Sequence, residues 1–139
     1  MYTEEVDPLI LFVSPFLQDA QALKAALSEL SIPVEHVTCL REAGTRLRTR
    51  QFRVILTEAD LRDGGWKDVL RIAQQASCPG HVIVTHPFAD ARFWAEAINL
   101  GAFDVMAQPF DRSEIRRILQ SALEHSDTAA IGATAGYFG

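Results

Sequence analysis

The sequence predicts a doubly wound α/β fold, in which one sheet of five parallel strands is covered on its two faces by five helices. Three observations predict it. Short, continuously apolar runs such as residues 9–13 are typical of strands buried on both faces. Segments with apolar residues at helical steps of three and four alternate with these runs. The links between segments are short, which is the pattern of neighbouring parallel strands joined by helical crossovers.

Three strands are expected in the first half of the chain, at residues 9–13, 34–39 and 52–57. The helix between the first two ends before Pro33, because proline cannot continue a helix. A short arginine-rich helix is expected at residues 40–51. The apolar stripe of the first helix consists of Leu17, Ala20, Leu23, Leu27 and Leu30.

The second half begins with a loop at residues 60–65, where two glycines favour turn conformations. Two more strands are expected at residues 81–85 and 103–107. Gly101 is a predicted C-cap of the fourth helix, and Ser113 is a predicted N-cap of the last one. The apolar stripes of these three helices are Trp66, Val69, Leu70 and Ala73; Phe93, Trp94, Ala97 and Ile98; and Ile115, Ile118, Leu119, Ala122 and Leu123.

Right-handed crossovers leave few topologies for such a chain, and the flavodoxin-like strand order 2-1-3-4-5 is the favoured one. We expect an N-terminal extension at residues 1–7, one domain at 8–125 and a flexible tail at 126–139. In folds of this class, function gathers at the carboxyl ends of the strands. Those ends carry Ser14, Pro15, Glu58, His86 and Gln108.

Composition and charge limit the classes of protein to which the chain can belong. With 48% hydrophobic and 22% charged residues in 139, the chain has the make-up of one folded globular domain. The net charge of −5 argues against a dedicated nucleic-acid binder. Cys39 and Cys78 stand alone, which fits a reducing compartment. The sequence has neither the features of a signal peptide nor an apolar run of the roughly 18 residues that a membrane span needs, and we expect a cytoplasmic protein.

Four segments together resemble the receiver domain of bacterial two-component response regulators, over about residues 8–125. They are the apolar strand at 9–13, the strand and loop at 54–65, the segment at 82–90, and the Gly-Ala…Gln-Pro-Phe segment at 101–110. The spacings between Glu58, His86 and Gln108 also match those between the family's phosphoacceptor, its Thr/Ser and its lysine.

The resemblance implies that most of the family's phosphorylation chemistry is missing, so that the chain is a pseudo-receiver. Glu58 stands at the phosphoacceptor position, where we expect it to place a permanent negative charge, and His86 stands at the hydroxyl position, with Thr85 adjacent. Gln108 replaces the lysine, and Val105 replaces the switch aromatic. Ser14, Pro15 and Phe16 occupy the positions of the acidic pocket, and none is a carboxylate. We therefore expect no metal, no magnesium cofactor and no enzymatic activity.

The function implied is a signalling module of a phosphorelay system that acts by protein–protein interaction, in a pathway that involves a histidine kinase. The family's interaction face corresponds to the fourth helix, fifth strand and fifth helix, at residues 90–124, where a partner or a second copy would bind. Two alternatives stay open: a phosphorylatable receiver with Glu58 or Asp60 as the acceptor, and a small-ligand binder that uses the strand-end crevice.

Three finer features complete the expectations. The resemblance favours a cis peptide bond between Gln108 and Pro109. His86 either hydrogen-bonds Glu58 or faces solvent. An arginine cluster on the second helix is either a solvated face or a docking site for an acidic partner or nucleic acid, although no recognition motif accompanies it. The cluster consists of Arg41, Arg46, Arg48, Arg50 and Arg53.

Overall fold

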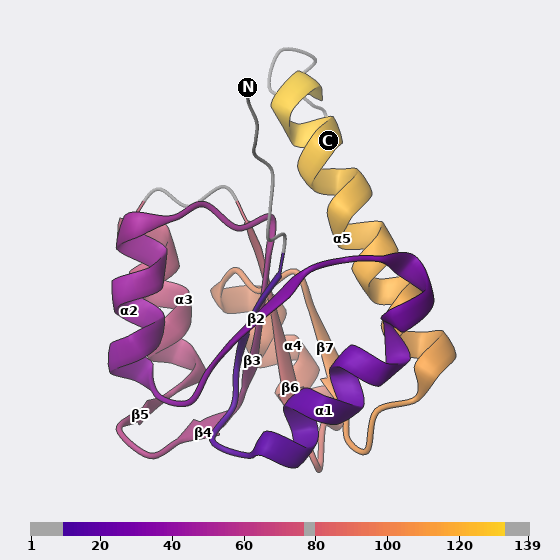
Figure 1. The fold of residues 1–139 in the computed structure, drawn as a ribbon. Helices are drawn as coiled ribbons and strands as arrows, with labels where there is room; N and C mark the ends of the chain where they lie inside the picture. Colours follow the sequence, from indigo (N-terminus) through magenta and orange to yellow (C-terminus); the bar gives the residue numbers. More distant parts are fainter. Residues whose placement is uncertain (1–9, 77–79, 133–139) are drawn as a thin grey trace.

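The computed structural model describes residues 10–76 and 80–132, and its centre is one sheet of five parallel strands (Figure 1). The strands occur in the order β2-β1-β3-β6-β7. Every neighbouring pair in this sheet is parallel. This is the predicted 2-1-3-4-5 order once the strands of the large sheet are counted alone. The strands span Ile10–Val13 (β1), Val34–Val37 (β2), Val54–Glu58 (β3), His81–His86 (β6) and Asp104–Ala107 (β7).

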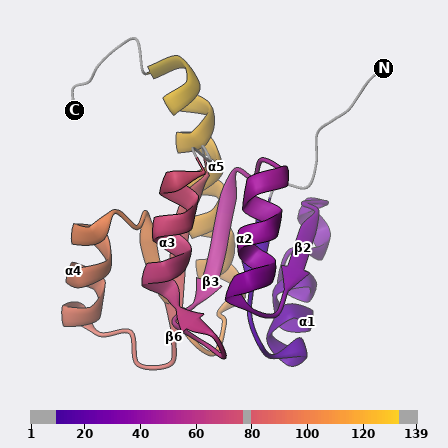
Figure 2. The ribbon, with the colours of Figure 1, turned by 90° about the vertical axis from the view of Figure 1, so that its left-hand side faces the viewer.

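Helices cover both faces of the sheet, and each face has its own core. Leu23 of α1 and Ile115 of α5 pack with Phe12 and Leu56 on one face. Leu47 of α2 and Val69 of α3 pack with Ile55 on the other, and α4 contributes Ala97 to that side (Figure 2). Alternate strand residues therefore point to opposite cores, as expected for a sheet buried on both sides. The helices are Leu17–Ala26 (α1), Leu40–Thr49 (α2), Trp66–Gln75 (α3), Ala91–Leu100 (α4) and Arg112–Gly132 (α5), with a 3-10 turn at Ser28–Leu30.

The segment expected to be a plain loop contains a small hairpin, which joins β4 (Asp60–Leu61) to β5 (Gly64–Gly65). At its tip, Asp63 accepts hydrogen bonds from the backbone N–H groups of Leu40 (2.7 Å) and Arg41 (3.1 Å). A carboxylate at the first turn of a helix satisfies unpaired N–H groups and complements the helix dipole. The hairpin is thereby attached to the start of α2.

Of two predicted helix caps, one is confirmed and the other is wrong. Gly101 ends α4 with φ 115°, which confirms the predicted glycine C-cap, since this left-handed conformation favours glycine. The expected N-cap Ser113 of the last helix is wrong. Asp111 holds that position and accepts from the Glu114 N–H (3.2 Å), while the Ser113 hydroxyl donates to the same carboxylate (2.9 Å).

The last helix is longer than expected. α5 continues to Gly132, so residues 126–132 are helical where the sequence predicted a tail. Residues 1–9 and 133–139, and Cys78, lie outside the described part of the chain. No helix among the described residues is long and apolar enough to cross a membrane.

Candidate functional site

The carboxyl ends of β1, β3, β6 and β7 meet at one edge of the sheet, and α1 begins beside them. Ser14 follows β1, Glu58 ends β3, and Gln108 follows β7. The main chain joins these ends, because Ala59 N–H donates to Thr85 O (2.9 Å) and Gln108 N–H donates to His86 O (3.2 Å). We call the four polar side chains gathered there the strand-end site: Ser14, Asp19, Glu58 and Gln108.

Glu58 is a buried carboxyl group with a serine as its donor. Its side chain is only 6% exposed, and its Oε2 accepts a short hydrogen bond from the Ser14 hydroxyl. Ser14 is itself held from both sides of its backbone. Its N–H donates to Val37 O (3.0 Å), and its carbonyl lies 2.8 Å from Nε2 of His36. The serine is therefore positioned by β2 before it meets Glu58.

Asp19, from the first turn of α1, is the second carboxyl group of the site. Its Oδ2 accepts from Nε2 of Gln108 at 3.3 Å. Burial above all, together with the nearby Asp19 carboxyl, raises the pKa of Glu58 from 4.5 to about 7, against the opposing hydrogen bonds of Ser14 and Gln108. A group with this pKa is about half protonated at pH 7. The expected permanent negative charge at Glu58 is thus corrected to one that depends on pH near neutrality.

The two residues at the family's hydroxyl position face different ways. The His86 ring accepts the Phe88 N–H at Nδ1 (2.8 Å) and packs on Phe93 at 4.8 Å between ring centroids, toward α4. It makes none of the hydrogen bonds described for Glu58, and it is half-buried, so neither expected placement of His86 is found. Thr85 pairs in register with Glu58 and is fully buried, and its hydroxyl lacks a described hydrogen-bond partner.

The remaining predicted positions contribute no charge to the site. Pro15 is half-buried, and the Phe16 side chain is 53% exposed. Val105 is packed in the core on the α3 side of the sheet with Val84 and Ala97. Asp60 lies in the β4–β5 hairpin, exposed and outside the large sheet. The peptide bond between Gln108 and Pro109 is cis, which confirms that prediction.

The strand-end site does not match the needs of a magnesium ion. Magnesium prefers an octahedron of oxygen ligands, usually carboxylates and waters. In the described part of the chain, no three or more His, Cys, Asp or Glu side chains are grouped so that they could hold a metal ion. Asp19 and Glu58 supply two carboxyl groups, and Glu58 already accepts from Ser14. We derive no step through a metal, and a function without magnesium stays a prediction.

Sequence reasoning missed Asp19. It falls between Leu17 and Ala20 of the apolar stripe, on the polar side of the first helix, so the stripe does not indicate it. Its signal is positional: the first turn after β1 necessarily lies at the carboxyl edge of the sheet. A polar residue there is within reach of the site even when it is off the apolar stripe.

Sequence relatives of the chain are few and distant among those compared. No family model matches the chain. A curated relative, the response regulator protein PilR of Pseudomonas aeruginosa, is 24% identical over 103 residues, which is 74% of this chain. The chain spans 23% of the length of that relative.

Solved structures agree with the fold. The signal receiver domain of an HD-domain-containing protein from Pseudomonas fluorescens has a TM-score of 0.77 and 28% identity, over 87% of this chain and 98% of that one. The signal receiver domain of a Luxo repressor protein from Vibrio parahaemolyticus has a TM-score of 0.85 and 20% identity, over 95% of this chain and 100% of that one. The NtrC4 receiver domain, described as a beryllofluoride-activated dimer, has a TM-score of 0.79 and 22% identity, over 86% and 99%.

The chain therefore has the fold of a receiver domain of the response-regulator class. Its sequence similarity to PilR and to the Pseudomonas fluorescens receiver agrees with that assignment.

Proposed function

We propose that this domain is a receiver-like signalling module of a two-component pathway, which acts through protein–protein contacts and without phosphorylation of a carboxyl group. One observation carries the proposal. Gln108 stands where the resemblance places the family's lysine, and its amide donates to Asp19. A neutral amide engaged by a carboxylate is a poor partner for a phosphoryl group.

The chemistry of the site supports the same conclusion. Phosphoryl transfer relies on a metal ion and cationic side chains to neutralise charge on the transferred oxygens. The hydrogen bonds described for Asp19, Glu58 and Gln108 include no lysine or arginine. A carboxyl nucleophile must also be ionised, and Glu58 is about half protonated at neutral pH because its pKa is about 7. Half protonation lowers the concentration of the nucleophile only about twofold, so the main obstacle is that the described hydrogen bonds of the site bring no cation to an acyl phosphate on Glu58.

The test is incubation of the whole chain with magnesium and acetyl phosphate, followed by intact mass. We expect no gain of mass, and no change of amide NMR shifts at the strand ends with beryllofluoride. A gain of one phosphoryl group would overturn the proposal. Glu58→Gln and Asp60→Asn would then decide which carboxylate accepts it.

A rebuilt variant supplies the positive control for this test. Pro15→Asp, Glu58→Asp and Gln108→Lys restore the residue types that the resemblance implies at these positions. If only the triple variant is phosphorylated, the assay works, and these three positions explain why the wild-type chain is not phosphorylated.

The proposed interaction face is formed by α4, β7 and α5. Among α4 residues only Ala97 is buried, whereas Trp94 is 47% and Leu100 46% exposed. A groove of about 630 Å³ runs along the outer side of this helix and is lined by Trp94, Ala95, Glu96, Ile98 and Asn99. Exposed apolar surface of this kind marks a contact site. The NtrC4 receiver dimer favours a second copy as the partner.

Two arginines of α5 extend away from this face. Arg112 and Arg116 extend to the end of α1, where they donate to the carbonyls of Ala25 (3.5 Å) and Ala26 (3.3 Å). Arg116 also pairs with Glu29 at 2.6 Å. The charges left on the face are those of residues such as Arg92 and Arg117, which are exposed.

Sedimentation tests the face with a matched pair of variants. Trp94→Glu places a charge on the proposed contact, so we expect it to weaken self-association at least tenfold. Leu17→Glu alters another exposed apolar residue, on α1, and should have no effect. A wild-type chain that stays monomeric at high concentration would contradict the homodimer.

Binding of a small ligand is the outcome that would redirect the proposal. A groove of about 310 Å³ beside α1 is lined by Asp19, Ala22, Pro87, Gln108, Pro109 and Phe110. A reproducible thermal shift with one compound of a nucleotide and metabolite screen, abolished by Gln108→Ala, would favour a ligand-binding domain in place of a phosphorylation-independent module.

As part of the same proposal, we place the protein in the cytoplasm, in a signalling pathway that includes a histidine kinase.

A further inference from the structure

A second surface is built from β2 and α2, on the side of the sheet opposite to β7 and the α4 face. A groove of about 610 Å³ opens there and is lined by His36, Val37, Arg41, Glu42, Thr45 and Arg46. We call it the β2–α2 groove. It lies away from β7 and α4, because β2 and β7 are the two edge strands of the large sheet (Figure 2).

Within residues 10–76 and 80–132, the outer edge of β2 has backbone groups that pair with no other strand. Ile10 N–H donates to Pro33 O (3.3 Å) and Ser14 N–H donates to Val37 O (3.0 Å), so these two carbonyls point toward β1. Backbone groups alternate in direction along a parallel strand, so those of Val34 and His36 point outward. Among the described residues no strand pairs with that edge. Such an edge is a template for an added strand.

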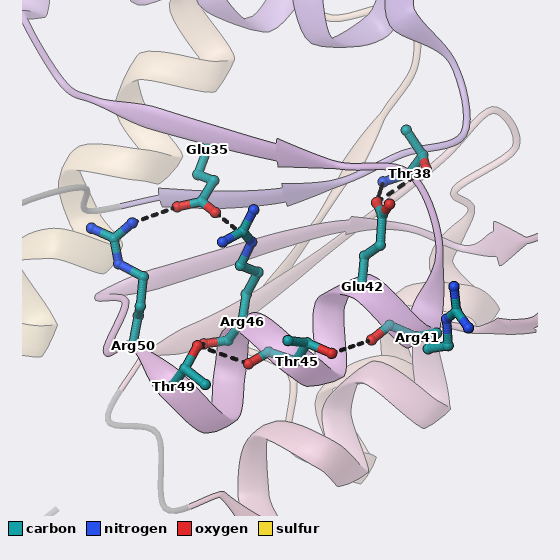
Figure 3. A network of polar contacts seen from close by, with 8 residues as sticks. All are labelled: Glu35, Thr38, Arg41, Glu42, Thr45, Arg46, Thr49 and Arg50. Atoms are coloured by element: carbon teal, nitrogen blue, oxygen red, sulfur yellow. Dashed lines mark hydrogen bonds and ion pairs between the residues drawn. The ribbon is translucent and has the colours of Figure 1, made fainter.

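The groove already binds one carboxylate. Arg46 and Arg50, one helical turn apart on α2 and its exit, hold Glu35 of β2 through contacts of 2.7 Å and 3.0 Å (Figure 3). This arrangement fixes two guanidinium groups over the sheet edge. It uses only one carboxylate, so the positive charge of the pair is not fully neutralised.

Arg41 adds a further charge at the other end of the groove. Its backbone is held by Asp63 and Thr45, and its guanidinium makes no described hydrogen bond or ion pair (Figure 3). Arg41, Arg46 and Arg50 lie in the groove or beside it, in a chain whose net charge is −5. The carboxylates near them are those of Glu35, Glu42 and Asp63, and Asp63 is engaged by the backbone N–H groups at the start of α2, while Arg48 lines a separate hollow with Ile72 of α3.

Glu42 sets the length of the free edge. Its carboxylate accepts from the Thr38 N–H (2.8 Å) and hydroxyl (3.1 Å). These two bonds satisfy the Thr38 N–H and lower the pKa of Glu42. The carboxylate is engaged with Thr38, and the open edge is limited to Val34–Val37.

We propose that the β2–α2 groove binds an extended acidic segment of a partner protein, which adds as a strand to the edge of β2. Backbone pairing at Val34 and His36 would orient the segment. Side chains at alternate positions of an added strand point toward α2, so carboxylates spaced by two residues would meet Arg41 and Arg46. The groove is separate from the α4 face, and it adjoins the strand-end site at His36, whose Nε2 lies 2.8 Å from the Ser14 carbonyl oxygen.

NMR titration of the uniformly labelled whole chain tests the proposal. The probe is a capped heptapeptide in which glutamate alternates with valine, and the comparison peptide carries lysine in place of glutamate. We expect shifts confined to residues 34–46 with the acidic peptide alone, and slower hydrogen exchange of the His36 N–H. Raising the salt concentration should weaken the binding.

Three variants check the assignment. Arg41→Gln should weaken binding about fivefold to tenfold, the loss of one charge-assisted contact. Thr45→Glu should abolish it, because it places a carboxylate in the middle of the groove without touching the Glu35 pairs. Arg92→Gln on α4 removes an exposed arginine far from the groove and should leave binding unchanged.

The opposite results are equally definite. If millimolar acidic peptide causes no NMR shift, or if the lysine peptide causes equal shifts, the proposal is overturned. The arginines would then be an ordinary solvated helix surface. Tighter binding of a single-stranded oligothymidine than of the acidic peptide would replace the protein partner by nucleic acid.

Discussion

At the scale of single residues, Glu58 combines burial with a nearby like charge. The carboxyl lies among Ser14, Asp19 and Gln108, and the hydrogen bonds described for it include no cation. Its pKa of about 7 means that the folded chain binds its proton more tightly than the unfolded chain. Folding stability must then fall as pH rises from 4.5 to 7, since the folded state holds more protons across that interval.

The first prediction concerns that pH dependence. Glu58→Gln removes the titration while it keeps the size and polarity of the side chain. We expect the free energy of unfolding of the wild type to decrease by roughly 3 kcal/mol at most between pH 5 and pH 8, and the variant to be nearly flat. Urea unfolding at several pH values measures both. Equal slopes for the two proteins would show that Glu58 titrates normally.

The second prediction concerns the donor to Glu58. Ser14→Ala removes the hydroxyl that donates to Oε2, and this bond lowers the pKa of Glu58 against the effect of burial. We expect the pKa to rise above 7 and stability at pH 8 to fall by about 1–3 kcal/mol. The carboxyl carbon shift of Glu58 reports the pKa directly. Ser28→Ala, at an exposed serine bonded to Ala25 O, is the control and should change neither quantity.

The sequence predicted the location of those site residues that stand directly at the end of a strand. Glu58 and Gln108 lie at the strand ends because a parallel sheet gathers its carboxyl ends at one edge, and this follows from strand order alone. Asp19 and the direction of His86 were not predictable in that way. Asp19 depends on how α1 is placed over β1, and His86 turns toward Phe93 because β6 points it to the α4 side.

At the scale of elements, the β4–β5 hairpin and α2 form one unit through Asp63. Four-residue pairing is too short to give a period in the sequence, so the hairpin was expected to be a loop. The long strands and amphipathic helices were predictable, because burial on one or both faces imposes a pattern on the residues. Ser113 and Asp111 are both capping residue types, and only the backbone path decides between them.

The third prediction tests that unit. Asp63→Ala leaves the N–H groups of Leu40 and Arg41 without their acceptor, so we expect the midpoint of denaturant unfolding to fall. These bonds lower the pKa of Asp63. The contribution is therefore present above the unfolded pKa of 3.8 and disappears as pH falls below it. Denaturant unfolding at pH 7 measures the loss, and Asp60→Ala on the same hairpin is the control. A loss equal to that of the control would mean that the cap does not stabilise α2.

At the scale of the whole molecule, the four side chains of the strand-end site make no described contact with α4. The main chain does connect them, because the Gln108 N–H donates to His86 O and the His86 ring packs on Phe93 of α4. A receiver switch requires an element with two arrangements that both sites favour differently. Val105, which the resemblance places at the switch-aromatic position, is packed in the core with Val84 and Ala97. His86 is held by the Phe88 N–H and stacked on Phe93. These contacts hold both side chains, and the described ones include none of the four strand-end side chains.

The fourth prediction is that the two sites are uncoupled. Glu58→Gln removes the ionisable group of the strand-end site, and it should leave the α4 face as it was. The reporter is the indole N–H of Trp94, which donates to Asp104 Oδ1 at 3.3 Å on that face. We expect its NMR shift to be the same in wild type and variant at pH 6 and pH 8, and the self-association constant to agree within about twofold. Gln108→Lys is a second perturbation of the same site and should behave alike. A pH-dependent indole shift in the wild type that Glu58→Gln abolishes would instead reveal a proton-driven connection through β6 or β7, and the domain would then switch without phosphate.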